Sequence, residues 1–416
     1  MSAAPPIIGN YPALSKAEIN RALTTRLSAL CLFFGPFLSG FVIAEPAPYE
    51  LYMAGLIGVW AVLGLRISQT VGALLAILIV FNIGGIVSMT QMDDWTGAPL
   101  YIAVSFFLAG TSVFIAAVIE ADHRRLKPII IGWTAAATIT GLLGIAGYFG
   151  FAGETFTRFG RAKGAFEDPN VFGPFLALPA IYCLGTLLTK PLSRPYICVS
   201  VLSVLTLATF LSFSRAAWGM YAFSVISLVL LLLLINPSNR FRLRVIMLAV
   251  FAVFALVGAL VIALQIDGVA EMFSTRAQLV QEYDGARLGR FARHGMGFAM
   301  AMEHPLGLGI LQFAGIFGED QHNVYLKALW DYSWLGFAAY MLLILLTLGL
   351  GVRFMLRDRP WRLLLMCSWI VFLGHVIVGY VIDTDHWRHF FLLLGIIWGC
   401  AALEIKWQRS GNGVRT

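Results

Sequence analysis

The composition of this 416-residue chain limits the class of protein to which it can belong. Hydrophobic residues make up 59% of the sequence and charged residues only 12%, whereas an ordinary soluble domain carries about 25% charged residues. The formal net charge of +7 is no sign of a nucleic-acid partner, because the basic residues fall between apolar runs. The sequence therefore predicts an integral membrane protein that lies in a lipid bilayer and binds no nucleic acid.

Apolar runs recur along the whole chain and predict an all-α membrane domain, since a transmembrane helix needs about 20 apolar residues. No internal repeat or low-complexity segment interrupts the pattern. We expect a single membrane domain over 1–416 with one hydrophilic excursion at 265–322. The twelve predicted spans lie at 27–44, 51–65, 69–89, 99–119, 128–150, 169–188, 195–213, 216–235, 245–264, 323–350, 362–382 and 386–404.

The positions of Lys and Arg predict how these spans are oriented. Loops on the cytoplasmic side of a membrane are enriched in basic residues. If the N-terminus is cytoplasmic, most of the 29 basic residues but few of the 22 acidic residues fall in cytoplasmic loops. The sequence thus predicts a multi-pass membrane protein with both termini in the cytoplasm and the 265–322 loop on the outer side.

Basic residues on the outer side are the informative exceptions to this bias. Arg215 lies in a tight hairpin between two spans, where a cation is costly unless an anion meets it. We interpret Arg276, Arg293 and Lys327 as anchors whose charged ends reach the lipid headgroups. The remaining outer cations include Arg158, Arg161 and Lys163 in the loop before Asp168, and Arg287 and Arg290 in the 265–322 loop.

Three polar motifs coincide with the outer end of a predicted helix. Asp168 followed by Pro169 is a typical helix start, with an N-cap and a proline in the first turn. Ser214 precedes another span, and His322 and Asn323 precede the tenth. Helix N-termini attract anions through their free N–H groups and the positive end of the helix dipole. Capping alone accounts for Asp168, but the neighbouring cations favour an anion-binding site.

The sequence predicts no metal and no cofactor. The five cysteines lie in separate apolar runs, and no histidine pair has the spacing of metal ligands. His386 and His389 are three residues apart, with Arg388 between them. In the same outer turn, Asp385 could pair with an arginine or hold a catalytic histidine in one tautomer. An interfacial turn anchored by Trp387 is an equally good interpretation.

Four segments in this order carry a resemblance to a known family: 164–170 (GAFEDPN), 214–216 (SRA), 289–309 and 322–326 (HNVYL). Together they resemble the O-antigen ligase and O-antigen polymerase superfamily of bacterial inner-membrane glycosyltransferases, over about residues 128–400. The resemblance implies a C-type glycosyltransferase fold and an active site open to the periplasm. It also implies metal-independent, inverting transfer of a glycan from undecaprenyl diphosphate to an acceptor hydroxyl.

The resemblance also implies roles for single residues. Arg215, Arg290 and His322 correspond to the catalytic arginines and histidine of the family. Arginine binds a diphosphate through two parallel hydrogen bonds and keeps its charge at any pH, and histidine is a suitable base near neutral pH. Many members have Trp where this chain has His294. The further candidate ligands of the diphosphate or glycan are Arg161, Lys163, Asn170, Arg287, Asn323, Asp385 and Arg388.

The acceptor separates the alternative functions. A ligase transfers the glycan to lipid A-core or a similar lipid or glycan acceptor, whereas a polymerase joins repeat units of O-antigen or exopolysaccharide. A relative that glycosylates protein hydroxyls would tend to carry extra outer domains. A transporter or flippase usually has charges or broken helices near the bilayer midplane, but here the charges lie at the outer ends of spans. We predict a ligase, with the polymerase as the first alternative and the transporter as the second.

Overall fold

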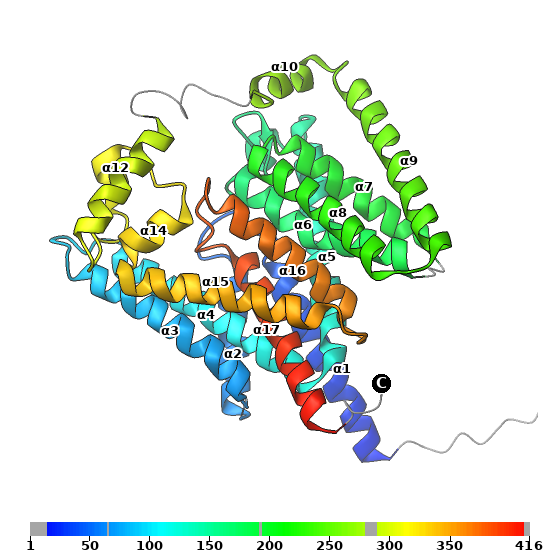
Figure 1. Ribbon diagram of the computed structural model, residues 1–416, viewed down its shortest axis with the longest axis horizontal. Coiled ribbons are helices and arrows are strands. Elements are labelled where there is room, and N and C mark those ends of the chain that lie inside the picture. The colour runs from blue at the N-terminus through cyan, green and yellow to red at the C-terminus, as the bar shows by residue number, and fades with distance from the viewer. Residues whose placement is uncertain (1–14, 65, 191–193, 279–288, 412–416) are drawn as a thin grey trace, which may run out of the picture.

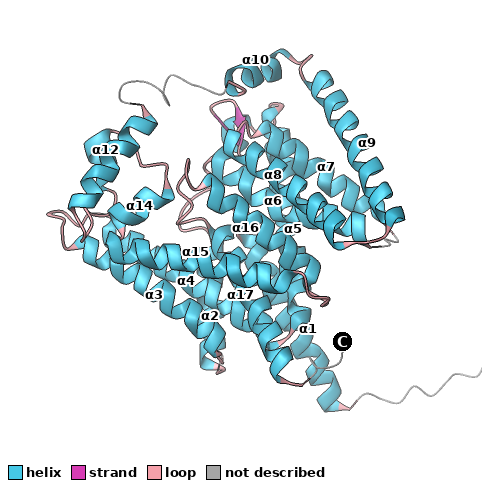
Figure 2. Ribbon diagram, viewed as in Figure 1, coloured by secondary structure: helices cyan, strands magenta, loops and turns pink. Residues whose placement is uncertain are grey.

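A computed structural model describes residues 15–64, 66–190, 194–278 and 289–411 of the chain. Helices make up nearly all of the secondary structure (Figure 2), and the strands in these ranges are β1 (Thr157–Arg158) and β2 (Arg161–Ala162), which pair antiparallel. The long helices are α1 (Lys16–Leu38), α2 (Pro48–Val62), α3 (Gln69–Met89), α4 (Ala98–Ala121), α5 (Leu126–Tyr148), α6 (Pro169–Thr189), α7 (Pro195–Leu211), α8 (Arg215–Ile235), α9 (Asn239–Ala263), α15 (Ser333–Met355), α16 (Arg362–Val378) and α17 (Arg388–Arg409).

Eight helices within the described ranges are long and apolar enough to cross a membrane. They are α3, α4, α6, α8, α9, α15, α17 and the stretch His123–Tyr148 that contains α5. The helices α7 and α16 are apolar but shorter, at 17 residues each. The chain is therefore an all-α, multi-pass membrane protein. The number of twelve spans stays a prediction.

The helices α17 and α9 mark the two extremes of packing. In an 18-residue apolar segment of α17, 83% is buried inside the protein, whereas in the corresponding segment of α9 only 6% is buried. Gly395 and Gly399 let α17 approach α4 closely, because a Cβ at either position would lie within 2.9 Å of a backbone oxygen of α4. The helix α9 lies at the edge of the bundle (Figure 1). A helix that is apolar on all sides and yet exposed is stable only in lipid.

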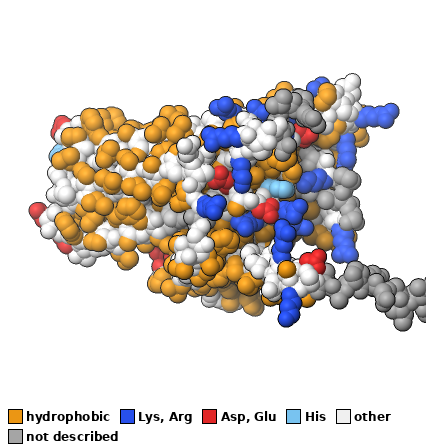
Figure 3. All heavy atoms as spheres, turned by 90° about the horizontal axis from the view of Figure 1, so that it is seen from below, with side chains coloured by type: hydrophobic (Ala, Val, Ile, Leu, Met, Phe, Trp, Pro, Cys, Tyr) orange, Lys and Arg blue, Asp and Glu red, His pale blue; other side chains and the backbone are white. Residues whose placement is uncertain are grey.

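The surface of the molecule separates apolar from basic side chains. Hydrophobic side chains cover the left-hand part of the face in Figure 3, and Lys and Arg gather toward its right-hand end. An apolar belt with a basic end is the pattern of a membrane protein.

Two of the predicted helix starts are confirmed. The Asp168 side chain caps α6 by accepting a hydrogen bond from the Asn170 N–H, and Pro169 is the first helical residue. The Ser214 hydroxyl caps α8 by accepting from the Ala217 N–H. Both caps are local interactions between residues two or three positions apart, so they could be recognised in the sequence.

The predicted continuous span at 323–350 is wrong, because the chain breaks into α14 (Val324–Asp331) and α15. Ser333 has a left-handed backbone with φ of +62° at the break. The cause is the packing of Tyr332, whose ring stacks on Phe81 of α3 with the centroids 4.0 Å apart. Gly84 of α3 leaves room for the Tyr332 carbonyl, which would contact any Cβ at that position.

The hydrophilic excursion at 265–322 contains short helices where the structure describes it. These are α10 (Asp267–Arg276), α12 (Arg290–Glu303) and α13 (Gln312–Phe317). In Figure 1, α10 and α12 lie on the same side of the helical bundle, and both stand beyond the ends of the long helices.

Candidate active site

A cavity of about 630 Å³ lies between α10, α12 and the ends of the long helices. Its lining residues come from segments far apart in the sequence, and two sets of charged side chains dominate it. We call the first set the arginine wall, formed by Arg161, Arg215, Arg276 and Arg290. We call the second set the carboxylate wall, formed by His322, Lys327, Asp383, Asp385 and His386.

Arg161 is the most buried member of the arginine wall. Its side chain is 6% exposed, and its Nε–H donates to the carbonyl oxygen of Ser212 at 2.8 Å. Its Nη2 donates to Oδ1 of Asn170, also at 2.8 Å. These bonds tie the β1–β2 hairpin to the α7–α8 turn and to the start of α6. Both predicted residues line the cavity, and the hydrogen bond between them holds each in place.

The other arginines of this wall lie at helix ends. Arg215 is the first residue of α8, and its Nη1 donates to the Gln278 carbonyl at 3.2 Å. Arg290 is the first residue of α12, and Arg276 is the last residue of α10. All three are half-buried. The positive ends of the α8 and α12 dipoles add to the charge of Arg215 and Arg290, so this wall is suited to bind an anion.

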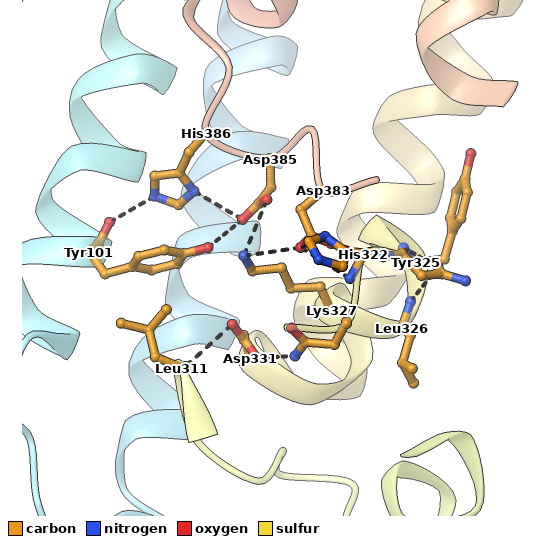
Figure 4. Close-up of polar contacts among 12 residues, drawn as sticks. Tyr101, Leu311, His322, Tyr325, Leu326, Lys327, Asp331, Asp383, Asp385 and His386 are labelled. Carbon is orange, nitrogen blue, oxygen red and sulfur yellow. Dashed lines mark hydrogen bonds and ion pairs between the residues drawn. The ribbon is translucent and has the colours of Figure 1, made fainter. Parts of the chain in front are cut away.

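The carboxylate wall is a network of contacts around Asp385 (Figure 4). Oδ2 of Asp385 accepts a hydrogen bond from the Tyr101 hydroxyl at 2.6 Å and lies 2.9 Å from Nδ1 of His386. The His386 ring also packs on the Tyr101 ring, with the centroids 3.9 Å apart. The Lys327 ammonium lies 3.7 Å from Oδ1 of Asp385. Asp385 is therefore held from three directions.

Asp383 connects this network to His322. Its carboxylate accepts the backbone N–H groups of His322 at 3.2 Å and Asn323 at 2.9 Å. These two bonds stabilise the left-handed backbone of His322, whose φ is +48°. Nδ1 of His322 lies 3.9 Å from Oδ2 of Asp383, which is an electrostatic contact and too long for a hydrogen bond. The imidazole, 41% exposed, faces the cavity.

The charges of the carboxylate wall shift one another's pKa values. Burial lowers the pKa of Lys327, but Asp385 and Asp383 outweigh burial and raise it above its ordinary value. Burial raises the pKa of Asp385, but Lys327 and His386 hold it well below its usual range. Burial also raises the pKa of Asp383, and here Lys327 only opposes the shift. Asp385 is thus firmly ionised, and Asp383 is the carboxyl that takes up a proton more easily.

The structure brings six of the predicted site residues to one cavity. The catalytic candidates Arg215, Arg290 and His322 line it together with Arg161, Asn170 and Asp385. Arg287 lies outside the described residues. Lys163 is half-buried but does not line the cavity.

Two predicted ligands have structural partners instead. The Asn323 side chain caps α14 by accepting the N–H groups of Tyr325 and Leu326 at 3.1 Å. The Arg388 side chain, only 14% exposed, binds Glu50 and also Glu45, the latter at 3.0 Å. Arg388 thus has carboxylate partners within the fold and does not line the cavity, and its role as a ligand stays a prediction.

The three basic residues predicted as headgroup anchors lie in different surroundings. Lys327 is 7% exposed and bridges two carboxylates, so its assignment as a headgroup anchor is wrong. Arg276 lines the cavity. Arg293 forms an ion pair with Glu319 at 2.5 Å.

Four members of the site were not predicted from the sequence, namely Lys327, Asp383, Tyr101 and His386. A signal for Lys327 existed, because a lysine within an apolar run is costly unless it is paired. Its partners, Asp383 and Asp385, both lie in the turn before α17. Tyr101 carried no signal, since a tyrosine near the end of an apolar helix usually marks the membrane interface.

No group of three His, Cys, Asp or Glu side chains is placed to hold a metal ion in the part of the chain that the structure describes.

Comparison with protein-family models gives no match for this chain, and comparison with curated protein sequences gives none either.

Proposed function

We propose that this protein is a membrane glycosyltransferase that transfers a glycan from a lipid-linked diphosphate to an acceptor hydroxyl. The observation that carries the proposal is that the arginine wall and His322 line one cavity. Such a transfer requires a site for the diphosphate and a base for the acceptor. The arginine wall would supply the first, and His322 in the carboxylate wall would supply the second. The resemblance to the O-antigen ligase superfamily supports the same reaction.

The arginine wall would stabilise the leaving group. As the bond between the anomeric carbon and the phosphate oxygen breaks, negative charge develops on the diphosphate. Guanidinium groups bind phosphate oxygens in pairs of hydrogen bonds, and Arg215 and Arg290 add the positive ends of two helices. Such preorganised donors supply the largest share of catalysis in many enzymes.

His322 would act on the acceptor. The acceptor oxygen attacks the anomeric carbon as the diphosphate leaves, and the hydroxyl proton passes to the imidazole. The Asp383 carboxylate lies on the Nδ1 side of the ring, which leaves Nε2 to accept the proton. Attack opposite to the leaving group inverts the anomeric centre.

The same proposal includes the topology of the protein. Twelve spans, cytoplasmic termini and a periplasmic 265–322 loop would place the cavity at the outer face of the bacterial inner membrane, where an undecaprenyl diphosphate donor reaches it from the bilayer. A membrane-impermeant thiol reagent applied to intact cells should label a cysteine introduced at Gly318 and spare one at Asn239. The reverse labelling would place the cavity on the cytoplasmic side and contradict the proposal.

Reconstituted protein tests the reaction directly. Protein in lipid nanodiscs is incubated with an undecaprenyl-diphosphate glycan and either lipid A-core or excess lipid-linked glycan as acceptor. Release of undecaprenyl diphosphate with growth of lipid A-core identifies a ligase, and growth of the lipid-linked glycan identifies a polymerase. Absence of donor consumption in both arms contradicts the proposed function.

A further inference from the structure

Lys327 is a buried cation that no step of the proposed transfer uses. It lies on α14 with its ammonium 3.9 Å from Oδ2 of Asp383 and 3.7 Å from Oδ1 of Asp385. The same ammonium lies 5.2 Å from the centre of the Tyr101 ring, where a cation is attracted by the π electrons. Figure 4 shows it pointing between the two carboxylates.

The two carboxylates that share Lys327 are anchored differently. Asp385 is bound to Tyr101 and His386, which belong to α4 and to the turn before α17. Asp383 is bound to the backbone of His322 and its neighbour Asn323. Lys327 is therefore the charge that connects a fixed carboxylate to the one that supports His322.

We propose that Lys327 is a positioning residue whose charge holds Asp383, and through Asp383 the His322 backbone, in the arrangement that transfer requires. This inference rests on the proposed function of the cavity. It assigns Lys327 no contact with donor or acceptor.

The electrostatics of the surrounding groups supports this role. The groups that act on Asp383 are Lys327, Asp385, His322 and Asp320, and Asp331 also faces Lys327. Without Lys327, this buried region keeps its acidic groups but loses the ammonium that neutralises them. Like charges in such a place cannot all stay ionised. Burial raises the pKa of Asp331 to about 8, so this group is protonated first. Loss of Lys327 then raises the pKa of both Asp383 and Asp385. Asp383 takes up a proton before Asp385, because burial already raises its pKa while His386 and Tyr101 still lower that of Asp385.

Protonation of Asp383 has a structural consequence at His322. A neutral carboxylic acid accepts the two N–H groups more weakly than a carboxylate does. The left-handed backbone at His322 then loses the interaction that stabilises it, and the imidazole shifts. A misplacement of about 1 Å in an active site costs about 100-fold in rate.

The test compares Lys327→Met with the wild-type protein in the donor-consumption assay across pH. We expect turnover to fall about 100-fold with the KM for the donor unchanged, because the arginine wall is intact. Activity requires ionised Asp383 and is lost as the pH falls through its pKa. Since loss of an adjacent cation raises that pKa, the acid limb of the pH profile should move upward by about one unit or more.

A second variant separates charge balance from simple loss of structure. The double variant Lys327→Met, Asp385→Asn removes the cation together with one carboxylate, and the new amide can still accept from Tyr101. It should return the acid limb to the wild-type position and recover most of the turnover, even if the single variant fails to accumulate. Lys127→Met, at an exposed position on α5, is the matched control and should behave as wild type.

Three results would decide against the inference. A wild-type pH profile in Lys327→Met would show that the lysine does not support Asp383. A raised donor KM that the double variant does not correct would make Lys327 a direct ligand of the donor. A double variant that stays inactive or fails to accumulate would show that charge balance is not what Lys327 supplies. An inactive wild-type protein would instead contradict the proposed function.

Discussion

The two walls of the cavity are built in different ways. The arginine wall draws Arg215, Arg276 and Arg290 from the ends of separate helices, and each of these side chains is half-buried. The carboxylate wall is a connected network in which Lys327 and Asp385 are buried and share a contact. The arginine wall gathers positive charge, whereas opposite charges neutralise one another within the carboxylate wall.

This difference separates binding from positioning. A wall of cations attracts an anion over several ångströms, but solvent and salt weaken that attraction where the side chains are exposed. A neutralised network attracts little and instead fixes the groups that belong to it. We therefore expect substitutions in the arginine wall to act on the donor and substitutions in the carboxylate wall to act on the orientation of His322.

The largest effect should follow from His322→Ala. Loss of a general base lowers turnover by a factor of about 100 to 10,000, and the donor should still bind because the arginine wall is unchanged. The measurement is donor consumption by purified protein, with His304→Ala as the control at an exposed position after α12. If His322→Ala keeps most of the turnover, the base is another group and the two walls are misassigned.

Replacing Arg215 or Arg290 with lysine should have the next largest effect. Lysine keeps the charge but cannot form the two parallel hydrogen bonds of a guanidinium group. Loss of such a transition-state contact costs about 100- to 1000-fold in rate. Arg240→Lys, at an exposed position on α9, should be neutral. Full activity of both lysine variants would mean that the wall acts through charge alone.

Arg388→Ala tests a residue that belongs to neither wall. It leaves Glu50 without its partner, and because the Glu50 side chain is 17% exposed, the loss should cost about 3 kcal/mol of stability. Thermal unfolding in detergent should show a lower Tm, whereas the donor KM should stay constant. A raised KM with an unchanged Tm would restore Arg388 as a substrate ligand. Glu45→Ala, at a carboxylate that is 64% exposed, should change stability by less than about 1 kcal/mol.

Arg293→Ala should have a small effect although Arg293 lies on the same helix as Arg290. Its partner Glu319 is 59% exposed, and exposed ion pairs contribute about 0 to 1 kcal/mol. Complementation of a deletion strain, scored by the glycan ladder at equal membrane protein level, should match the wild type. A loss as severe as that of Arg290→Lys would extend the arginine wall along α12.

Chelation should have no effect on activity. The arginine wall can supply the compensating charge that a divalent cation supplies in many phosphoryl and glycosyl transfers. Purified protein in excess EDTA should consume the donor at the untreated rate. Activity that disappears with EDTA and returns with magnesium or manganese would remove the role assigned to the arginine wall.

The features that could be predicted from the sequence depend on neighbouring residues. The starts of α6 and α8 follow from Asp168 and Ser214, which cap the helices that come directly after them. The presence of apolar helices follows from composition alone. Arg215 and Arg290 stood out as outer cations, and both line the cavity.

The features that could not be predicted depend on partners far apart in the chain. Arg388 was expected to face a substrate, but the fold places Glu45 and Glu50 beside it. The break between α14 and α15 arises from the stacking of Tyr332 on Phe81. In both cases the deciding contact joins distant segments, and no periodicity or cap within either segment reports it.

The contrast between α9 and α17 bears on how this chain tolerates mutation during evolution. Lipid tails adapt to any apolar surface, so most positions of α9 are constrained by hydropathy and hardly by shape. The surroundings of α17 are other helices, and Gly395 and Gly399 have no room for even a methyl group. Substitutions among Leu, Ile, Val and Phe can therefore accumulate in α9 as neutral drift. In α17 most such substitutions would disturb the packing, so we expect its sequence to change more slowly.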